Sequence, residues 1–78
     1  MDIEIYTTKT CAYCVRAKSL LKNIGLAFTE TDVSKDPDKA IEIAERSGQK
    51  TVPQIFIDGR SIGGFTELTE LNAAGELN

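Results

Sequence analysis

Cys11-Ala12-Tyr13-Cys14 lies at a junction, because a strand pattern ends just before this stretch and a helix pattern begins within it. The alternation Ile3-Glu4-Ile5-Tyr6 predicts a strand over residues 3–7. From residue 12 to about residue 24, apolar side chains recur at three- and four-residue spacing, which predicts a helix that ends at Gly25. The two cysteines therefore belong to the first turn of a helix, the second pointing inward and the first at the exposed tip.

The sequence around the cysteines is basic, although the whole chain has a formal net charge of −3. Residues 5–29 contain no acid and carry four cationic side chains: Lys9, Arg16, Lys18 and Lys22. Nearby cations and the positive end of a helix dipole stabilise a thiolate over short distances. We therefore expect a reactive thiolate at the first cysteine. The negative net charge of the whole chain argues against a nucleic-acid partner.

Length and composition indicate one small domain over residues 1–78, with 41% hydrophobic and 27% charged residues. Residues 1–4 are acidic rather than basic, and no apolar run approaches the ~20 residues that span a bilayer. We therefore expect no membrane association and a cytoplasmic location. In that reducing setting, a pair of cysteines three positions apart is typical of catalysis or metal binding rather than of a structural disulfide.

A zinc site within this chain is not expected, because such a site needs about four ligands and the chain has two Cys and no His. The number of ligands in one chain does not exclude a metal that is shared between two chains or held together with thiols from outside the chain.

The remaining patterns alternate between strands and helices. Residues 26–33 predict a second strand, and Asp36-Pro37 then predicts a helix start with an N-cap and a proline at the first helical position. That helix is expected to end at Gly48. Its expected buried residues are Ala40, Ile41 and Ala44.

A hairpin and a last helix are expected to complete the chain. Residues 53–57 and 60–62 predict two strands joined by an Asp58-Gly59 turn. The final helix is expected to begin with Thr66 as its cap and to end at Gly75. Its expected buried residues are Phe65, Leu68 and Leu71, and Leu77 is expected to pack back on the domain.

Three segments together resemble the signature of a dithiol glutaredoxin: Cys11-Ala12-Tyr13-Cys14, Thr51-Val52-Pro53 and Ile62-Gly63-Gly64-Phe65. The resemblance covers essentially the whole chain, so residues 1–78 are expected to form a single glutaredoxin domain. It implies the thioredoxin-like α/β fold, with the order β-α-β-α-β-β-α and a four-stranded mixed sheet flanked by three helices.

The resemblance also implies the reaction, which is glutathione-dependent reduction of protein–glutathione mixed disulfides and of protein disulfides. Cys11 would be the nucleophile and Cys14 the resolving cysteine. Glutathione would be the cosubstrate, glutathionylated or disulfide-containing proteins the partners, and the protein a monomer.

The glutathione site implied by the resemblance uses backbone groups. A cis peptide bond before Pro53 would let the backbone of Val52 pair with the cysteinyl backbone of glutathione like an added strand. Bare N–H groups after the double glycine would bind the carboxylate of the γ-glutamyl end. The glycyl carboxylate would lie near Lys9 and Gln49. The candidate glutathione-binding residues are Lys9, Tyr13, Gln49, Thr51, Val52, Pro53, Gly64, Phe65 and Thr66.

Three departures from the common glutaredoxin pattern leave two alternatives open. Ala12 stands where proline is usual, and a small residue there is associated with a [2Fe–2S] cluster held by Cys11 from each of two chains and two glutathiones. Thr8 stands where a cation is typical. Phe65-Thr66 replaces a common Cys-Asp pair. The Gly64-Phe65 pair resembles that of glutaredoxin-like proteins that are reduced by thioredoxin reductase and donate electrons to ribonucleotide reductase.

Overall fold

The strand and helix patterns of the sequence become four strands and three helices in the computed structural model, which describes residues 1–77. Residue 78, the last of the expected domain, lies outside the described residues. The elements are β1 (Ile3–Thr7), α1 (Ala12–Asn23), β2 (Thr29–Asp32), α2 (Pro37–Ser47), β3 (Gln54–Ile57), β4 (Arg60–Gly63) and α3 (Phe65–Ala73).

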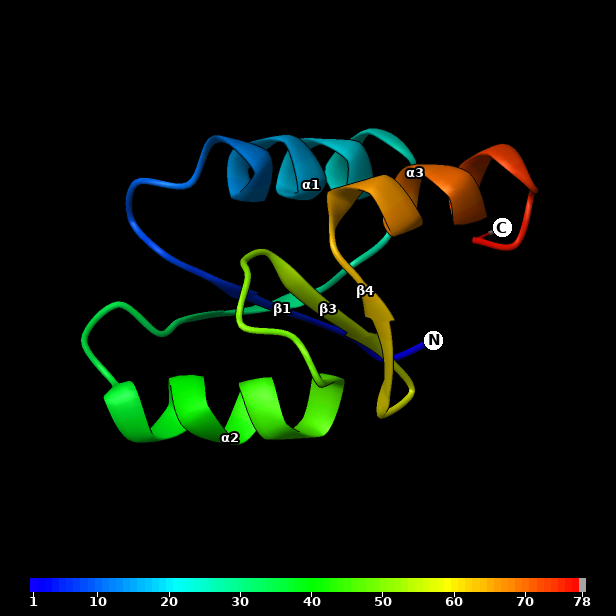
Figure 1. Ribbon diagram of the computed structural model, residues 1–78. Helices are drawn as coiled ribbons and strands as arrows, with labels where there is room; N and C mark the ends of the chain where they lie inside the picture. Colours follow the sequence, from blue (N-terminus) through cyan, green and yellow to red (C-terminus); the bar gives the residue numbers. More distant parts are fainter. Residues whose placement is uncertain (78) are drawn as a thin grey trace.

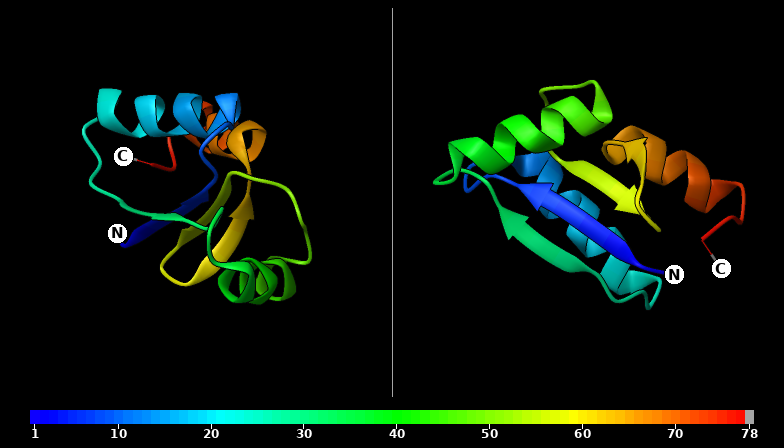
Figure 2. Two further views of the ribbon diagram at one scale, coloured as in Figure 1. Left: turned by 90° about the vertical axis from the view of Figure 1, so that its left-hand side faces the viewer. Right: turned by 90° about the horizontal axis from the view of Figure 1, so that it is seen from below.

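The four strands form one mixed sheet in the order β2-β1-β3-β4. β1 and β2 are parallel, whereas β1–β3 and β3–β4 are antiparallel. Helices α1 and α3 lie side by side over one face of the sheet, and α2 covers the other face (Figures 1 and 2). This arrangement confirms the thioredoxin-like fold that the sequence predicts.

Each face of the sheet has its own apolar cluster, because successive side chains of a strand point to opposite faces. The α1-face cluster consists of Ile3, Ile5, Ala17, Leu21, Ile55, Leu68 and Leu77. The α2-face cluster consists of Tyr6, Val33, Ile43 and Phe56, and the Tyr6 and Phe56 rings meet edge to face at 5.6 Å. The strand alternation read from residues 3–6 therefore divides the core into two layers.

Several local signals act as the sequence predicts. Asp36 caps α2 by accepting a hydrogen bond of 3.1 Å from the backbone N–H of Lys39, with Pro37 at the first helical position. The strands β3 and β4 are joined at Asp58-Gly59. Leu77 is buried, as expected for a residue that packs back on the core.

Two expectations for α2 and β2 are wrong in detail. Ile43 is the buried residue of α2, whereas Ile41 is 57% exposed. The helix turns 100° per residue, so a face that buries Ile43 and half-buries Ala40 and Ala44 leaves residue 41 outside. β2 begins at Thr29 rather than at Leu26, because only residues 29–32 pair with β1.

The start of α3 also differs from the prediction. The helix begins at Phe65, with Gly64 rather than Thr66 as the N-cap residue. Leu68 is fully buried, whereas Phe65 and Leu71 are half-buried at the edge of the α1-face cluster. Within residues 1–77, no helix combines the length and the apolarity that crossing a bilayer requires.

Candidate active site

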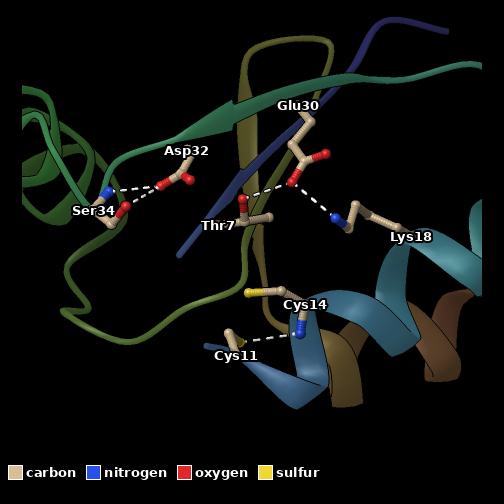
Figure 3. A network of polar contacts seen from close by, with 7 residues as sticks. All are labelled: Thr7, Cys11, Cys14, Lys18, Glu30, Asp32 and Ser34. Carbon is tan, nitrogen blue, oxygen red and sulfur yellow. Dashed lines mark hydrogen bonds and ion pairs between the residues drawn. The ribbon is translucent and has the colours of Figure 1, made fainter. Parts of the chain in front are cut away.

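Cys11 is the N-cap residue of α1, with an extended backbone (φ −103°, ψ 108°). Its Sγ accepts a hydrogen bond of 3.0 Å from the backbone N–H of Cys14 (Figure 3). The side chain is half-buried, so its sulfur remains accessible. A sulfur at this position lies at the positive end of the helix dipole and receives an N–H that would otherwise lack a partner. The start of α1 therefore holds the Cys11 sulfur as a hydrogen-bond acceptor.

Cys14 has the opposite environment. Only 1% of its surface is exposed, and it packs beneath the first turn of α1. Burial raises the pKa of the Cys14 thiol to about 12, helped by its hydrogen bond with Cys11 and opposed by a backbone hydrogen bond from Thr8. The inward second cysteine that the sequence predicts is present, whereas Cys11, which was expected at an exposed tip, is half-buried.

The segment just before β3 contacts Cys11. The Val52-Pro53 peptide bond is cis, as the resemblance implies. The Cys11 thiol donates a long hydrogen bond of 3.7 Å to the Val52 carbonyl oxygen. A Cβ added to Gly64 would lie 3.2 Å from the Pro53 carbonyl oxygen, so the start of α3 approaches this segment as closely as a glycine allows.

These segments enclose a cavity of about 170 Å³, here named the Pro53 cavity. Its lining residues are Tyr13, Gln49, Thr51, Val52, Pro53, Gly64, Phe65, Thr66 and Glu67. The structure thus brings together eight of the nine candidate glutathione-binding residues. Lys9 is exposed and does not line the cavity, and its charge instead helps to lower the pKa of Asp32, after hydrogen bonds from Ser34.

An aromatic wall closes one side of the Pro53 cavity. The rings of Tyr13 and Phe65 lie 5.9 Å apart at a tilt of 37°. The Arg16 guanidinium lies 5.2 Å from the centre of the Tyr13 ring, within the range of a cation–π contact. Tyr13 keeps 56% of its surface exposed, so the wall faces solvent on its outer side.

Glu67 is a residue of this cavity that the sequence analysis missed. Its Oε1 accepts a hydrogen bond of 2.6 Å from the backbone N–H of Gly64. The side chain folds back over Gly63, where an added Cβ would come within 2.5 Å of Oε1. An acid three residues after the helix cap is a known capping signal, so the Gly64-x-x-Glu67 spacing could have revealed it.

Gln54 was also missed, because a single polar residue in a strand pattern carries no distinctive signal. It is 2% exposed, and its amide nitrogen donates to the backbone carbonyls of Gln49 (3.3 Å) and Thr51. Both acceptors belong to the segment that lines the Pro53 cavity. Gln54 therefore fixes the shape of that segment from inside the core.

A second polar network lies behind Cys14 (Figure 3). The Glu30 carboxylate pairs with the Lys18 ammonium at 2.9 Å and accepts a hydrogen bond of 2.8 Å from the Thr7 hydroxyl. These two contacts, Lys18 first, lower the pKa of Glu30. The Lys18 charge also acts on Cys14, where it opposes the rise of the thiol pKa. The network ties α1 to β2 one turn beyond the second cysteine.

Residues 1–77 contain no group of three or more His, Cys, Asp or Glu side chains that could hold a metal ion. One chain would offer the Cys11 sulfur alone to an iron–sulfur cluster. The cluster alternative therefore depends wholly on a second chain and on outside thiols, and it stays a prediction from the sequence.

The sequence is similar to known glutaredoxins over nearly its full length. The family model described as Glutaredoxin matches residues 3–62. Glutaredoxin 3 of Escherichia coli (strain K12) is 48% identical over 77 residues, which cover 99% of this chain and 93% of that protein. A glutaredoxin of Pseudomonas aeruginosa is 42% identical over 76 residues, which cover 97% of this chain and 90% of that protein.

Solved structures give the same result. The crystal structure of a buckwheat glutaredoxin–glutathione complex matches with a TM-score of 0.88 at 28% identity, over 96% of this chain and 71% of that one. The solution structure of glutaredoxin from Brucella melitensis matches with a TM-score of 0.86 at 45% identity, over 99% and 84% of the two chains.

Proposed function

The chain belongs to the glutaredoxin family and is a thiol–disulfide oxidoreductase, and from that premise we propose that glutathione is its electron donor and Cys11 its nucleophile. The observation that carries the proposal is the position of the Cys11 sulfur, accessible at a helix N-terminus and 3.7 Å from Val52 at the Pro53 cavity. Val52, whose carbonyl oxygen accepts from the Cys11 thiol, also lines this cavity. The protein would act as a single glutaredoxin domain in a reducing, cytoplasmic setting.

The first proposed reaction removes glutathione from a protein. The Cys11 thiolate attacks the glutathione sulfur of a mixed disulfide, and the protein leaves as a thiolate that takes up a proton. A second glutathione thiolate then attacks the glutathionyl sulfur on Cys11. Oxidised glutathione leaves, and the Cys11 thiolate is restored. The N–H of Cys14, 3.0 Å from the sulfur, supports the negative charge at the start and end of this cycle.

The second proposed reaction reduces a protein disulfide and needs both cysteines. Cys11 forms a mixed disulfide with one substrate sulfur, and Cys14 then attacks the Cys11 sulfur and releases the substrate dithiol. The buried Cys14 thiol, with its pKa of about 12, holds its proton at neutral pH. It therefore reacts when the mixed disulfide forms beside it rather than as a free nucleophile.

The Pro53 cavity supports a defined orientation for glutathione. The Val52 backbone would pair with the cysteinyl residue, which places the glutathione sulfur against Cys11. The γ-glutamyl carboxylate would meet the N–H groups at the start of α3, and the glycyl end would lie toward Gln49. The buckwheat relative is described as a complex with glutathione, which supports this ligand for a chain of the same fold.

The test is glutathione-dependent reduction of a small mixed disulfide of cysteine and glutathione, coupled to NADPH and glutathione reductase. The wild type and Cys14→Ser are expected to turn over, whereas Cys11→Ser is expected to be inactive because no nucleophile remains. Reduction of an intramolecular protein disulfide should be lost in both variants. If the wild type is inactive with glutathione but is reduced by thioredoxin reductase, the proposal is overturned and thioredoxin reductase replaces glutathione as the electron donor.

A further inference from the structure

A second cavity lies on the other side of the segment that lines the Pro53 cavity. It has a volume of about 450 Å³ and separates α2 from residues 49–54. We name it the α2 groove. One wall is the apolar side of α2, with Ala40, Ile41 and Ala44, and the other wall is Gln49, Thr51 and Val52. Figure 1 shows this segment rising from the end of α2 to the start of β3, across the edge of the sheet.

Val52 connects the groove to the nucleophile. Its carbonyl oxygen is 3.7 Å from the Cys11 sulfur, whereas its side chain packs against the α2-face cluster and lines the α2 groove. Gln49 and Thr51 also line both cavities. The groove therefore begins at the residue whose carbonyl oxygen accepts from the Cys11 thiol.

The proposed pairing with Val52 decides which substrate side chain faces the groove. In an added strand, successive side chains point to opposite faces. A cysteine that points to Cys11, on the α1 side, has neighbours that point to the α2 side. In the orientation proposed for glutathione, the C-terminal neighbour lies toward Gln49, which is part of the groove. Glutathione has glycine at this position and leaves the groove empty.

We propose that the α2 groove binds an apolar side chain of the residue directly after the reacting cysteine of a polypeptide disulfide substrate. This inference rests on the proposed function and deepens it by naming the substrate class. The alanines and the isoleucine of α2 give the groove an apolar wall, and Ile41 is 57% exposed, as an unfilled contact surface would be. Lys50 and Glu45 contribute opposite charges, so neither an acid nor a base is favoured.

The substrate disulfide and the two cysteines account for all electrons, protons and sulfur–sulfur bonds of the proposed reaction. Cys11 attacks the cysteine whose C-terminal neighbour occupies the groove, and the other substrate sulfur leaves as a thiolate. Cys14 then loses its proton and attacks the Cys11 sulfur, and the bound substrate sulfur leaves and takes up a proton. Two electrons reduce the substrate disulfide, and Cys11 and Cys14 become a disulfide that two glutathiones reduce.

The test compares two symmetric peptide disulfides. Each is a disulfide-linked dimer of a capped peptide, Ala-Cys-Leu-Ala or Ala-Cys-Gly-Ala, so either sulfur presents the same neighbour. The wild type is expected to reduce the leucine peptide with a kcat/KM about tenfold higher than the glycine peptide, the low end for an apolar pocket, because the groove is open. The uncatalysed rate with glutathione is subtracted for each peptide.

Two groove variants and one control locate the preference. Ala44→Phe fills the groove from α2, and Ile41→Gln removes an exposed apolar contact without touching the core. Both should bring the leucine-to-glycine ratio to about two or less, while turnover of the cysteine–glutathione mixed disulfide stays within about twofold of wild type. Val15→Gln is the matched control, because Val15 is a 62% exposed apolar residue of α1 outside the groove, and it should keep the wild-type ratio.

The outcomes separate this inference from the proposed function. A wild type that is inactive on the mixed disulfide would overturn the proposed function. A wild type that is active there, but treats the two peptides alike or reduces neither, would overturn the groove assignment alone. The groove assignment is also overturned if Ile41→Gln keeps the wild-type leucine-to-glycine ratio. This variant tests the assignment even if Ala44→Phe does not fold.

Discussion

The α1 face of the sheet buries seven apolar residues, whereas the α2 face buries four and lies beside the α2 groove. Helices α1 and α3 cover the first face, and α2 covers the second (Figures 1 and 2). The cysteines belong to the start of α1, whose residues Ala17 and Leu21 are part of the closed cluster. The open face lies behind Val52, which lines both the α2 groove and the Pro53 cavity.

The largest test of this comparison removes one core side chain from each face. Leu21→Ala is expected to lower the free energy of unfolding by about 3–4 kcal/mol, because Leu21 is fully buried in the closed α1-face cluster. Ile43→Ala is expected to cost about 2 kcal/mol, because Ile43 borders the open groove, where water can enter the space left. Denaturant unfolding of both variants measures the difference. An equal or larger loss for Ile43→Ala would break the comparison.

The second test compares two glycines, one just before α3 on the α1 face and one at the end of α2 on the other face. Gly63, before α3, has φ +104° and lies under the Glu67 side chain, so Gly63→Ala combines a strained backbone with a clash. We expect a loss of about 2–3 kcal/mol. Gly48, after α2, has φ +75° with open space around an added Cβ, so Gly48→Ala is expected to cost about 1 kcal/mol. Thermal unfolding should rank them in this order, and the reverse order would mean that the exposed Glu67 side chain moves aside without cost.

The sequence predicted the closed face better than the open one. Residues 3–7 and the stripe of α1 carry local periodicity, which predicts both the elements and their buried sides. The cis bond at Pro53 followed from the resemblance and not from proline alone, for which trans is the usual form. Six of the eight candidate residues that line the Pro53 cavity belong to the three motifs, whereas Gln49 and Thr66 lie outside them.

What the sequence did not predict depends on contacts between distant segments. Ile41 was expected to be buried, since its apolar character is visible but the direction in which α2 faces the sheet is not. Gln54 acts through two carbonyls of a loop whose path is set by α2 and β3 together. Lys9 has the expected charge, yet it lies outside the Pro53 cavity because the chain turns away before Cys11.

The third test uses the burial of Cys14 on the closed face. Its thiol pKa of about 12 is raised above the ~8.5 of an unfolded cysteine, so folding favours the protonated form. The stabilisation is complete below about pH 8.5 and is lost as pH rises toward 12. Between pH 8.5 and 10, the reduced wild type should lose about 1–2 kcal/mol more unfolding free energy than Cys14→Ser. Parallel curves for the two proteins would mean that Cys14 titrates as an exposed thiol.

The smallest test compares one surface ion pair from each face. Lys18 pairs with Glu30 at 2.9 Å, and Glu30 also accepts from Thr7, so the contact joins α1 to β2. Lys39 and Glu42 are 3.4 Å apart within α2. Lys18→Gln is expected to cost about 0.5–1 kcal/mol and to raise the pKa of Glu30, because its first stabilising contact is lost, whereas Lys39→Gln should change stability by about 0.3 kcal/mol or less. Urea unfolding at low and high salt measures both, and NMR titration of Glu30 follows its carboxyl directly. If Lys18→Gln leaves the Glu30 titration unchanged, the Lys18–Glu30 pair adds nothing measurable to the contact between α1 and β2.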